Sequence, residues 1–229
     1  MSSILTFMGK RKVGNPLALA VLALLGEKPM HPYEMSSTLR ERAKEQSIKL
    51  NYGSLYSVVD ALVRHQLIEV YETVREGRRP ERTVYAITDP GRIELIDWLS
   101  ELLAVPVKEY TQFEAALSLI PVLSPDDALR LLEVRRMRLD AEIAASDGML
   151  AGWATTEDMS YLWAIEATYV LAMRRAEREF VNGVIEKIKK GELSAIRTWR
   201  RAHEIADGVP GVSEWEQAVK DEGVTWPNQ

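Results

Sequence analysis

The chain of 229 residues is long enough for one large domain or two modest ones, and its 46% hydrophobic and 28% charged residues are typical of a folded globular protein. It contains no cysteine, which excludes disulfides, thiolate catalysis and thiolate metal sites, and fits a reducing cytoplasm. The net charge of −5 argues against a uniformly basic surface for nucleic acid, yet the acidic excess lies after residue 104 and basic residues cluster before it.

The longest apolar run, residues 17–25, is too short to span a bilayer. Basic residues 10–12 precede it, but no small-residue cleavage site follows, so the run does not resemble a signal peptide. We interpret it as a buried core helix and predict a cytoplasmic protein with no membrane partner.

Three helices are expected within residues 14–65. Asn15 followed by Pro16 is typical of a helix start, which predicts a first helix to Leu25 that is apolar nearly all round. A second helix can run from Pro32 to about Lys44, before the polar stretch 45–49. The third lies within 51–65 and, if Gly53 opens it, buries Leu55, Val58, Val59 and Leu62 while Gly53, Ser57, Asp60, Ala61 and Arg64 face outward. This is the layout of a helix-turn-helix unit.

Residues 68–87 predict a β-hairpin. Ile68 and Val70 alternate with polar residues, a turn follows at 76–81, and residues 83–87 form the returning strand. Arg78, Arg79 and Arg82 lie at the turn, with Arg75 just before it. An arginine-rich loop tip is often only a solvated surface, but directly after a helix-turn-helix it indicates a wing along a phosphate backbone.

A fourth helix is predicted from Thr88-Asp89 to about Leu103, with Ile93, Ile96, Leu99 and Leu103 on one face. We therefore expect a basic tail at 1–13, a domain at 14–104 and a linker at 105–111 that contains Pro106.

Residues 112–208 are expected to form an α-helical domain, followed by a loosely attached tail at 209–229. A short helix at 113–120 precedes two long ones, from Ser124 to about Leu150 and from Glu157 to Lys190, and a last one at 194–206. The two long helices predict an antiparallel hairpin with more apolar surface than it can cover, which indicates self-association as a homodimer.

Within residues 17–103, a set of motifs together resembles the PadR family of bacterial transcriptional regulators: Ala23-Leu24-Leu25-Gly26, Met30-His31-Pro32-Tyr33-Glu34, Gly53-Ser54-Leu55-Tyr56, Leu67-Ile68, Gly77-Arg78-Arg79, Tyr85, Thr88-Asp89 and Gly91-Arg92. The resemblance implies a mainly α fold with a small β-wing: an N-terminal winged helix-turn-helix and a C-terminal antiparallel helical dimerisation domain. It also implies a repressor of genes that handle aromatic acids or other toxic small molecules.

The resemblance makes the helix beginning near Asn51 the recognition helix, and makes Tyr33, Tyr56, Arg78 and Arg79 contacts to phosphate or groove. Two positions depart from the family pattern: Pro32 stands where Gly is usual, and Ser57 where Pro is frequent.

From these features we expect a dimer on an inverted-repeat operator in double-stranded DNA. Ser54, Tyr56 and the arginine wing, Arg75, Arg78, Arg79 and Arg82, would position the protein, while Ser57, Ala61 and Arg64 would reach base edges. Asp60 would repel phosphate, so it either meets a cytosine amino group or pairs with Arg64 one turn on; the ion pair is the favoured alternative.

Trp98, Trp153 and Trp163, together with Trp199, are candidates for a cavity that binds a small aromatic ligand, although a tryptophan in a helical interface is more often core. No cofactor, metal site or catalytic residue is predicted, since the three histidines are scattered and His31 suits a helix start. The competing interpretation is a helical adaptor or scaffold that uses the winged domain for protein contacts.

Overall fold

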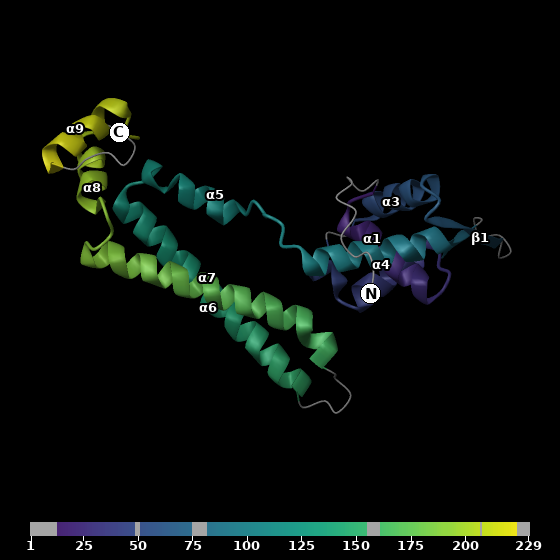
Figure 1. Cartoon of the computed structure of the whole chain (residues 1–229). Coiled ribbons are helices and arrows are strands. Elements are labelled where there is room, and N and C mark those ends of the chain that lie inside the picture. The colour runs from purple at the N-terminus through teal and green to yellow at the C-terminus, as the bar shows by residue number, and fades with distance from the viewer. Residues whose placement is uncertain (1–12, 49–50, 75–81, 155–160, 207, 224–229) are drawn as a thin grey trace. The chain divides into compact units, whose positions relative to one another are not determined.

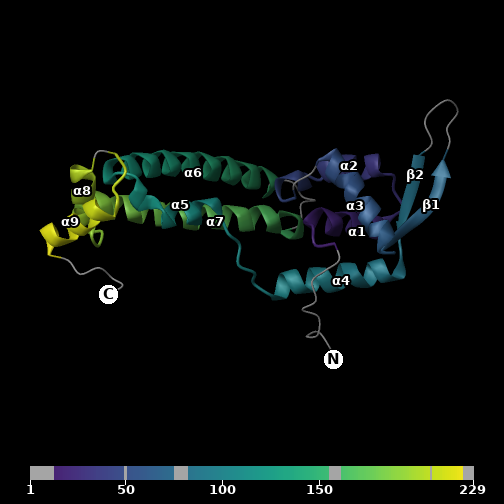
Figure 2. The same ribbon diagram turned by 90° about the horizontal axis from the view of Figure 1, so that it is seen from above.

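The computed structural model describes residues 13–48, 51–74, 82–154, 161–206 and 208–223. Its contacts divide the chain into an N-terminal unit, Met1–Lys108, and a C-terminal unit, Glu109–Gln229. Figures 1 and 2 show the elements of each unit from two directions. The division falls inside the segment 105–111 that the sequence predicts as a linker.

The N-terminal unit contains helices followed by a hairpin and a closing helix. In chain order these are α1 (Pro16–Glu27), α2 (Pro32–Glu41), the 3-10 turn η1 (Lys44–Gln46), α3 (Tyr52–Arg64), β1 (Ile68–Val74), β2 (Arg82–Ile87) and α4 (Asp89–Ala104). This arrangement confirms the prediction of a mainly helical winged helix-turn-helix. Helix α2 is shorter than expected, because Ala43 takes a left-handed backbone conformation that ends it.

Side-chain caps fix where these helices begin. Asn15 Oδ1 accepts a hydrogen bond from Leu17 N at 2.9 Å, and Asn51 Oδ1 accepts one from Ser54 N at 2.7 Å. His31 Nδ1 caps α2 through Tyr33 N at 3.0 Å. Each cap satisfies a main-chain N–H that has no partner inside its own helix.

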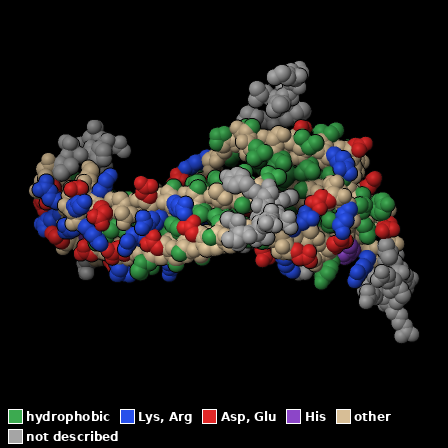
Figure 3. Space-filling model, turned by 90° about the horizontal axis from the view of Figure 1, so that it is seen from below, with side chains coloured by type: hydrophobic (Ala, Val, Ile, Leu, Met, Phe, Trp, Pro, Cys, Tyr) green, Lys and Arg blue, Asp and Glu red, His purple; other side chains and the backbone are tan. Residues whose placement is uncertain are grey.

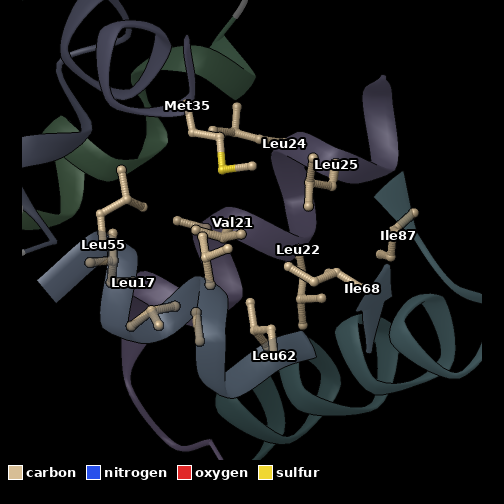
Figure 4. Close-up of a cluster of buried hydrophobic side chains, with 14 of the residues drawn as sticks. Leu17, Val21, Leu22, Leu24, Leu25, Met35, Leu55, Leu62, Ile68 and Ile87 are labelled. Atoms are coloured by element: carbon tan, nitrogen blue, oxygen red, sulfur yellow. The ribbon is translucent and has the colours of Figure 1, made fainter. Parts of the chain in front are cut away.

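One hydrophobic cluster holds the N-terminal unit together around α1. Figure 4 shows Leu17, Val21 and Leu22 of α1 directed toward Leu55 and Leu62 of α3, with Met35, Ile68 and Ile87 closing the cluster. The four α3 residues predicted to face inward, Leu55, Val58, Val59 and Leu62, are all buried. The core therefore fixes which face of α3 is left outward.

The hairpin pairs β1 and β2 as an antiparallel sheet, with Ile68 opposite Ile87 and Val70 opposite Tyr85. A register shift between Val70 and Glu72 interrupts the regular alternation of faces. Val70 precedes this shift and keeps regular register with Tyr85, yet it is 54% exposed, although its spacing from Ile68 predicts an inward position. Met30, just before α2, adds a bridge to Tyr85 and ties the hairpin to the helices.

Helix α4 closes the unit by packing on α1. Thr88 Oγ1 caps it by accepting from Gly91 N at 3.1 Å and donates to Gln66 O at 2.8 Å. Trp98 is 5% exposed and packs in the core, whereas the face predicted from Ile93, Ile96, Leu99 and Leu103 is exposed in this chain. In Figure 3 hydrophobic side chains lie among charged ones on the surface of this unit.

Among its described residues, the regular secondary structure of the C-terminal unit consists of helices. It comprises α5 (Gln112–Ser118), the 3-10 turn η2 (Ile120–Val122), α6 (Pro125–Ala154), α7 (Tyr161–Lys190), α8 (Ile196–Ile205) and α9 (Val212–Glu222). Helices α6 and α7 have 30 residues each, which corresponds to about 45 Å of length.

Ion pairs and a short apolar seam join α6 to α7. Arg135 pairs with Glu177, Arg178 with Asp140, Arg175 with Asp147, Arg174 with Glu142 and Lys189 with Glu133. The buried residues of the C-terminal cluster are Ala128, Leu132, Leu139, Val181, Ile185, Ile188, Ile196 and Trp199. The face of α7 marked by Leu162, Ile165 and Tyr169 is not in that cluster and is exposed.

The expectation of a loose tail after residue 208 is wrong for residues 212–222, which form α9 against α8. Ala218 is fully buried, and Arg201 Nε donates to Asp221 Oδ2 at 2.8 Å. Trp199 Nε1 also donates to Leu123 O at 2.8 Å, which fixes α8 to the segment before α6.

No helix in the described parts of the chain is long and apolar enough to cross a membrane.

Candidate nucleic-acid interface

The outward face of α3 is polar and open. Gly53, Ser57, Asp60 and Arg64 are exposed along one side of the helix, opposite its buried residues. Ala61, predicted to reach base edges, lies half-buried on the flank of this face. The exposed line therefore has three side chains capable of hydrogen bonding within two turns.

Local hydrogen bonds set the chemistry of two of these side chains. Ser57 Oγ donates to Gly53 O at 2.9 Å, so its hydrogen is engaged within the helix and its oxygen remains an acceptor. Arg64 Nε donates to the main-chain oxygen of Asp60 at 3.4 Å. The favoured ion pair between Asp60 and Arg64 is not formed, since the guanidinium turns to the carbonyl rather than to the carboxylate.

At the start of α3, the main-chain amide of Ser54 is not free to bind a phosphate. Ser54 N is already bound by the cap Asn51, so the half-buried Ser54 has only its hydroxyl to offer a phosphate. Tyr56 is exposed on α3, and Tyr33 at the start of α2 is 60% exposed. Exposed phenols on these two helix starts suit hydrogen bonds to a phosphate backbone.

His31 caps α2 and lies within the electrostatic influence of Arg82 at the start of β2. Burial lowers the pKa of His31, and the positive charge of Arg82 lowers it further, against an opposing effect of Glu34. The neutral imidazole is the form that accepts from Tyr33 N, because a protonated Nδ1 has no free lone pair. The sequence identified His31 as a helix-start residue, but its proximity to Arg82 depends on the fold.

A groove of about 540 Å³ separates α3 from the sheet. It is lined by Asp60, Val63 and Arg64 of α3 and by Val70 and Tyr85 of the strands. Burial raises the pKa of the Tyr85 phenol, and the charge of Asp60 adds to this effect. The sequence did not assign Val70 or Tyr85 to a groove; Tyr85 entered only among the residues that carry the family resemblance, and both were placed on strands beside the predicted recognition helix.

The wing contributes one described basic residue, Arg82, which is exposed at the start of β2. Arg75, Arg78 and Arg79 lie outside the described residues, so their predicted contacts remain predictions.

The three tryptophans proposed for ligand contact lie in different settings. Trp98 packs in the core of the N-terminal unit, the setting that is the more common one for a tryptophan in a helical interface, and its contact with a ligand stays a prediction. Trp153 is half-buried near the end of α6, and the side chain of Trp163 lies outside the described residues. Trp199 is also a core residue.

Within the described ranges, no group of His, Asp and Glu side chains has the geometry to hold a metal ion.

Comparison with known proteins associates this arrangement with one family. Residues 21–97 match the model of the transcriptional regulator PadR-like family. The negative transcriptional regulator PadR of Bacillus subtilis (strain 168) is 25% identical over 164 residues, which is 71% of this chain and 89% of that protein.

Two solved structures share the fold. The crystal structure of Bacillus subtilis PadR in complex with operator DNA is similar with a TM-score of 0.60 and 20% identity, over 76% of this chain and 99% of that one. The complex of the same protein with p-coumaric acid has a TM-score of 0.58 and 19% identity, over 77% and 99%.

Proposed function

We propose that the chain is a transcriptional regulator of the PadR-like family, to which its residues 21–97 are similar, and that it is a homodimeric repressor that binds an inverted-repeat operator and is released by a small aromatic ligand. Members of this family regulate transcription and are not enzymes.

The observation that carries the proposal is the polar face of α3 held outward by a buried apolar face. A recognition helix needs side chains at the surface that can bond base edges in the major groove, and Ser57, Asp60 and Arg64 are so placed. The core residues Leu55 and Leu62 hold the helix rigidly in that orientation.

Phosphate contacts would position the helix. We assign this role to exposed Tyr33, Tyr56 and Arg82, to the hydroxyl of Ser54, and by sequence to Arg75, Arg78 and Arg79. Such contacts supply affinity and salt dependence without sequence information.

Self-association would cover the exposed apolar stripe of α7. Leu162, Ile165, Tyr169 and Met173 follow one another at spacings of three and four along this helix, the pattern of a helix–helix seam. A twofold dimer presents two recognition helices, which requires half-sites about 10 bp or a multiple apart.

Release by a ligand is the regulatory part of the proposal. Bacillus subtilis PadR has been crystallised with p-coumaric acid, and we propose that a flat aromatic molecule of this kind contacts Trp153 and Trp163 here. A ligand that prefers the form unable to bind DNA lowers operator affinity by the ratio of its affinities for the two forms.

A gel-shift assay with the DNA upstream of the chain's own gene tests the proposal. We expect binding that weakens steeply as salt rises, and weakens further with an aromatic acid such as p-coumaric acid. Salt-independent or absent binding would instead favour a helical adaptor that uses the winged domain for protein contacts.

Ligand binding is tested separately by the tryptophan fluorescence of the DNA-free protein. If a broad set of aromatic acids changes neither the fluorescence nor the melting temperature while DNA binding persists, the result contradicts release by a ligand and leaves the proposed repressor intact.

A further inference from the structure

Asp60 lies in the middle of the exposed face of α3, between Ser57 and Arg64. This face of α3 lies opposite the face that packs in the core, so DNA that contacts Ser57 and Arg64 also approaches Asp60. A negative charge at the centre of a surface that approaches phosphates needs a chemical reason.

The Asp60 carboxylate is not neutralised within the protein. Among the residues that the structure describes, no hydrogen bond or ion pair ends on it, and Arg64 contacts only its main-chain oxygen. The two opposite charges therefore stand one turn apart, each with its polar end open to solvent.

The groove beside Asp60 offers no cation on its sheet side. On the strands, Val70 is apolar and Tyr85 presents a phenol. Water solvates this carboxylate in the free protein, and where DNA displaces that water the partner of the carboxylate has to come from the DNA.

DNA offers few suitable partners for a carboxylate. Phosphates repel it, and only the amino groups of cytosine and adenine donate hydrogen bonds in the major groove. Adenine presents the acceptor N7 beside its amino group, and N7 repels a carboxylate. Cytosine presents its amino group alone. The guanine paired with that cytosine presents O6 and N7, which suit the guanidinium of Arg64.

We propose that Asp60 determines specificity: its carboxylate accepts a hydrogen bond from the 4-amino group of an operator cytosine while Arg64 contacts the guanine of the same or the adjacent pair. This deepens the proposed function and rests on it, since it requires that α3 enter the groove.

The test begins with selection of preferred sites from random-sequence DNA by the full-length protein and by its Asp60→Ala and Asp60→Asn variants. Asp97→Asn is the matched control, because it removes the same charge from an exposed position on α4. We expect the wild type and Asp97→Asn to share one preferred cytosine. Asp60→Ala should lose that preference, and Asp60→Asn should shift it toward adenine.

A chemical probe then addresses the amino group itself. The selected cytosine is replaced by pyrimidin-2-one, which is cytosine without the 4-amino group. Wild-type affinity should fall by about fivefold to tenfold, whereas the affinity of Asp60→Ala should be unchanged by the replacement.

Equal preferences in all variants, with affinity raised alike for every sequence by Asp60→Ala, would overturn the proposal and leave Asp60 as a repulsive charge. Failure of the wild type to bind any DNA would overturn the proposed function as well, so the two failures are distinguishable. Unchanged circular dichroism melting of the variants verifies that the fold is intact.

Discussion

Gly91 shows how a single residue fixes the position of a helix. A Cβ added there would lie 2.0 Å from the main-chain oxygen of Leu67 and 2.8 Å from Ile87 Cγ1. The Leu67 oxygen cannot yield without moving main chain, and the Ile87 side chain is buried in the core. We predict that Gly91→Ala lowers the free energy of unfolding by about 3 kcal/mol, measured by thermal or urea denaturation.

Gly148 supplies the matched control for this prediction. It lies within α6 with nothing within 4 Å of an added Cβ, so Gly148→Ala should be neutral or should stabilise by up to about 1 kcal/mol. Similar unfolding of Gly91→Ala and wild type would show that α4 does not approach the Leu67 carbonyl this closely.

The pH dependence of stability should carry a contribution from His31. Folding lowers its pKa through burial and Arg82, so the unfolded chain takes up the proton more readily once the pH falls below about 6.5. The stability supplied by the neutral cap is thus present at higher pH and diminishes as the pH falls. His31→Asn keeps an uncharged cap, so its melting temperature should fall less than that of the wild type between about pH 7.5 and about pH 5.5. Parallel melting curves across this range would contradict the prediction.

Residue periodicity predicted the inward face of α3 because burial repeats with the helix turn. The partner of Arg64 could not be predicted, because a four-residue spacing permits contact with either the carboxylate or the carbonyl of Asp60. The choice between them depends on side-chain torsions, which the spacing of residues along a helix does not determine.

At the scale of elements, the wing should act through charge alone. Arg82 is exposed at the start of β2, so Arg82→Ala should weaken binding to all DNA sequences alike and reduce the slope of log affinity against log salt by about one unit. Arg130→Ala removes an equal charge from exposed α6 and should leave the slope unchanged. A change in base preference without a change in slope would place Arg82 over bases instead.

The exposed stripe of α7 should determine the oligomeric state. Ile165 is 52% exposed in the single chain, and a carboxylate buried in a helix–helix seam is strongly unfavourable. Ile165→Glu should therefore shift the protein from dimer to monomer in sedimentation velocity at micromolar concentration.

Val212→Glu is the control for that substitution. Val212 is 76% exposed on α9, outside the stripe, so the change adds the same charge without entering the proposed seam. Equal dimerisation by Ile165→Glu and wild type would remove α7 from the interface.

Helix starts were predictable because Asn15, Asn51 and Thr88 are caps whose acceptors lie close in sequence. Helix α9 was missed because glycine and proline precede it and its buried face depends on α8. The available signal was Glu214, three residues after Gly211, whose carboxylate accepts from Gly211 N at 2.8 Å.

For the whole molecule, each unit leaves apolar surface that its own core does not cover, on α4 in one and on α7 in the other. The division into a winged unit and a helical unit was predictable from the change in pattern near Pro106. A sequence pattern cannot say which apolar faces remain open, because α4 and α7 have apolar residues on more than one side and only the packing selects among them.

Dimeric recognition makes a prediction about the operator rather than about the protein. If the two α3 helices of a dimer bind the same face of the DNA, binding of one helix to its half-site raises the effective concentration of the second helix at the other half-site. Inserting about five base pairs between the half-sites turns them to opposite sides of the duplex, so affinity should fall to that of an operator with one half-site destroyed.

An insertion of about ten base pairs returns the two half-sites to the same side of the duplex and is the control for added length. The Ile165→Glu variant should bind the original, the five-base-pair and the single-half-site operators with similar affinity, since a monomer cannot sense spacing. Strong binding of the wild type to the five-base-pair operator would mean that the two recognition helices act independently. In that case, dimerisation would not be the source of operator affinity.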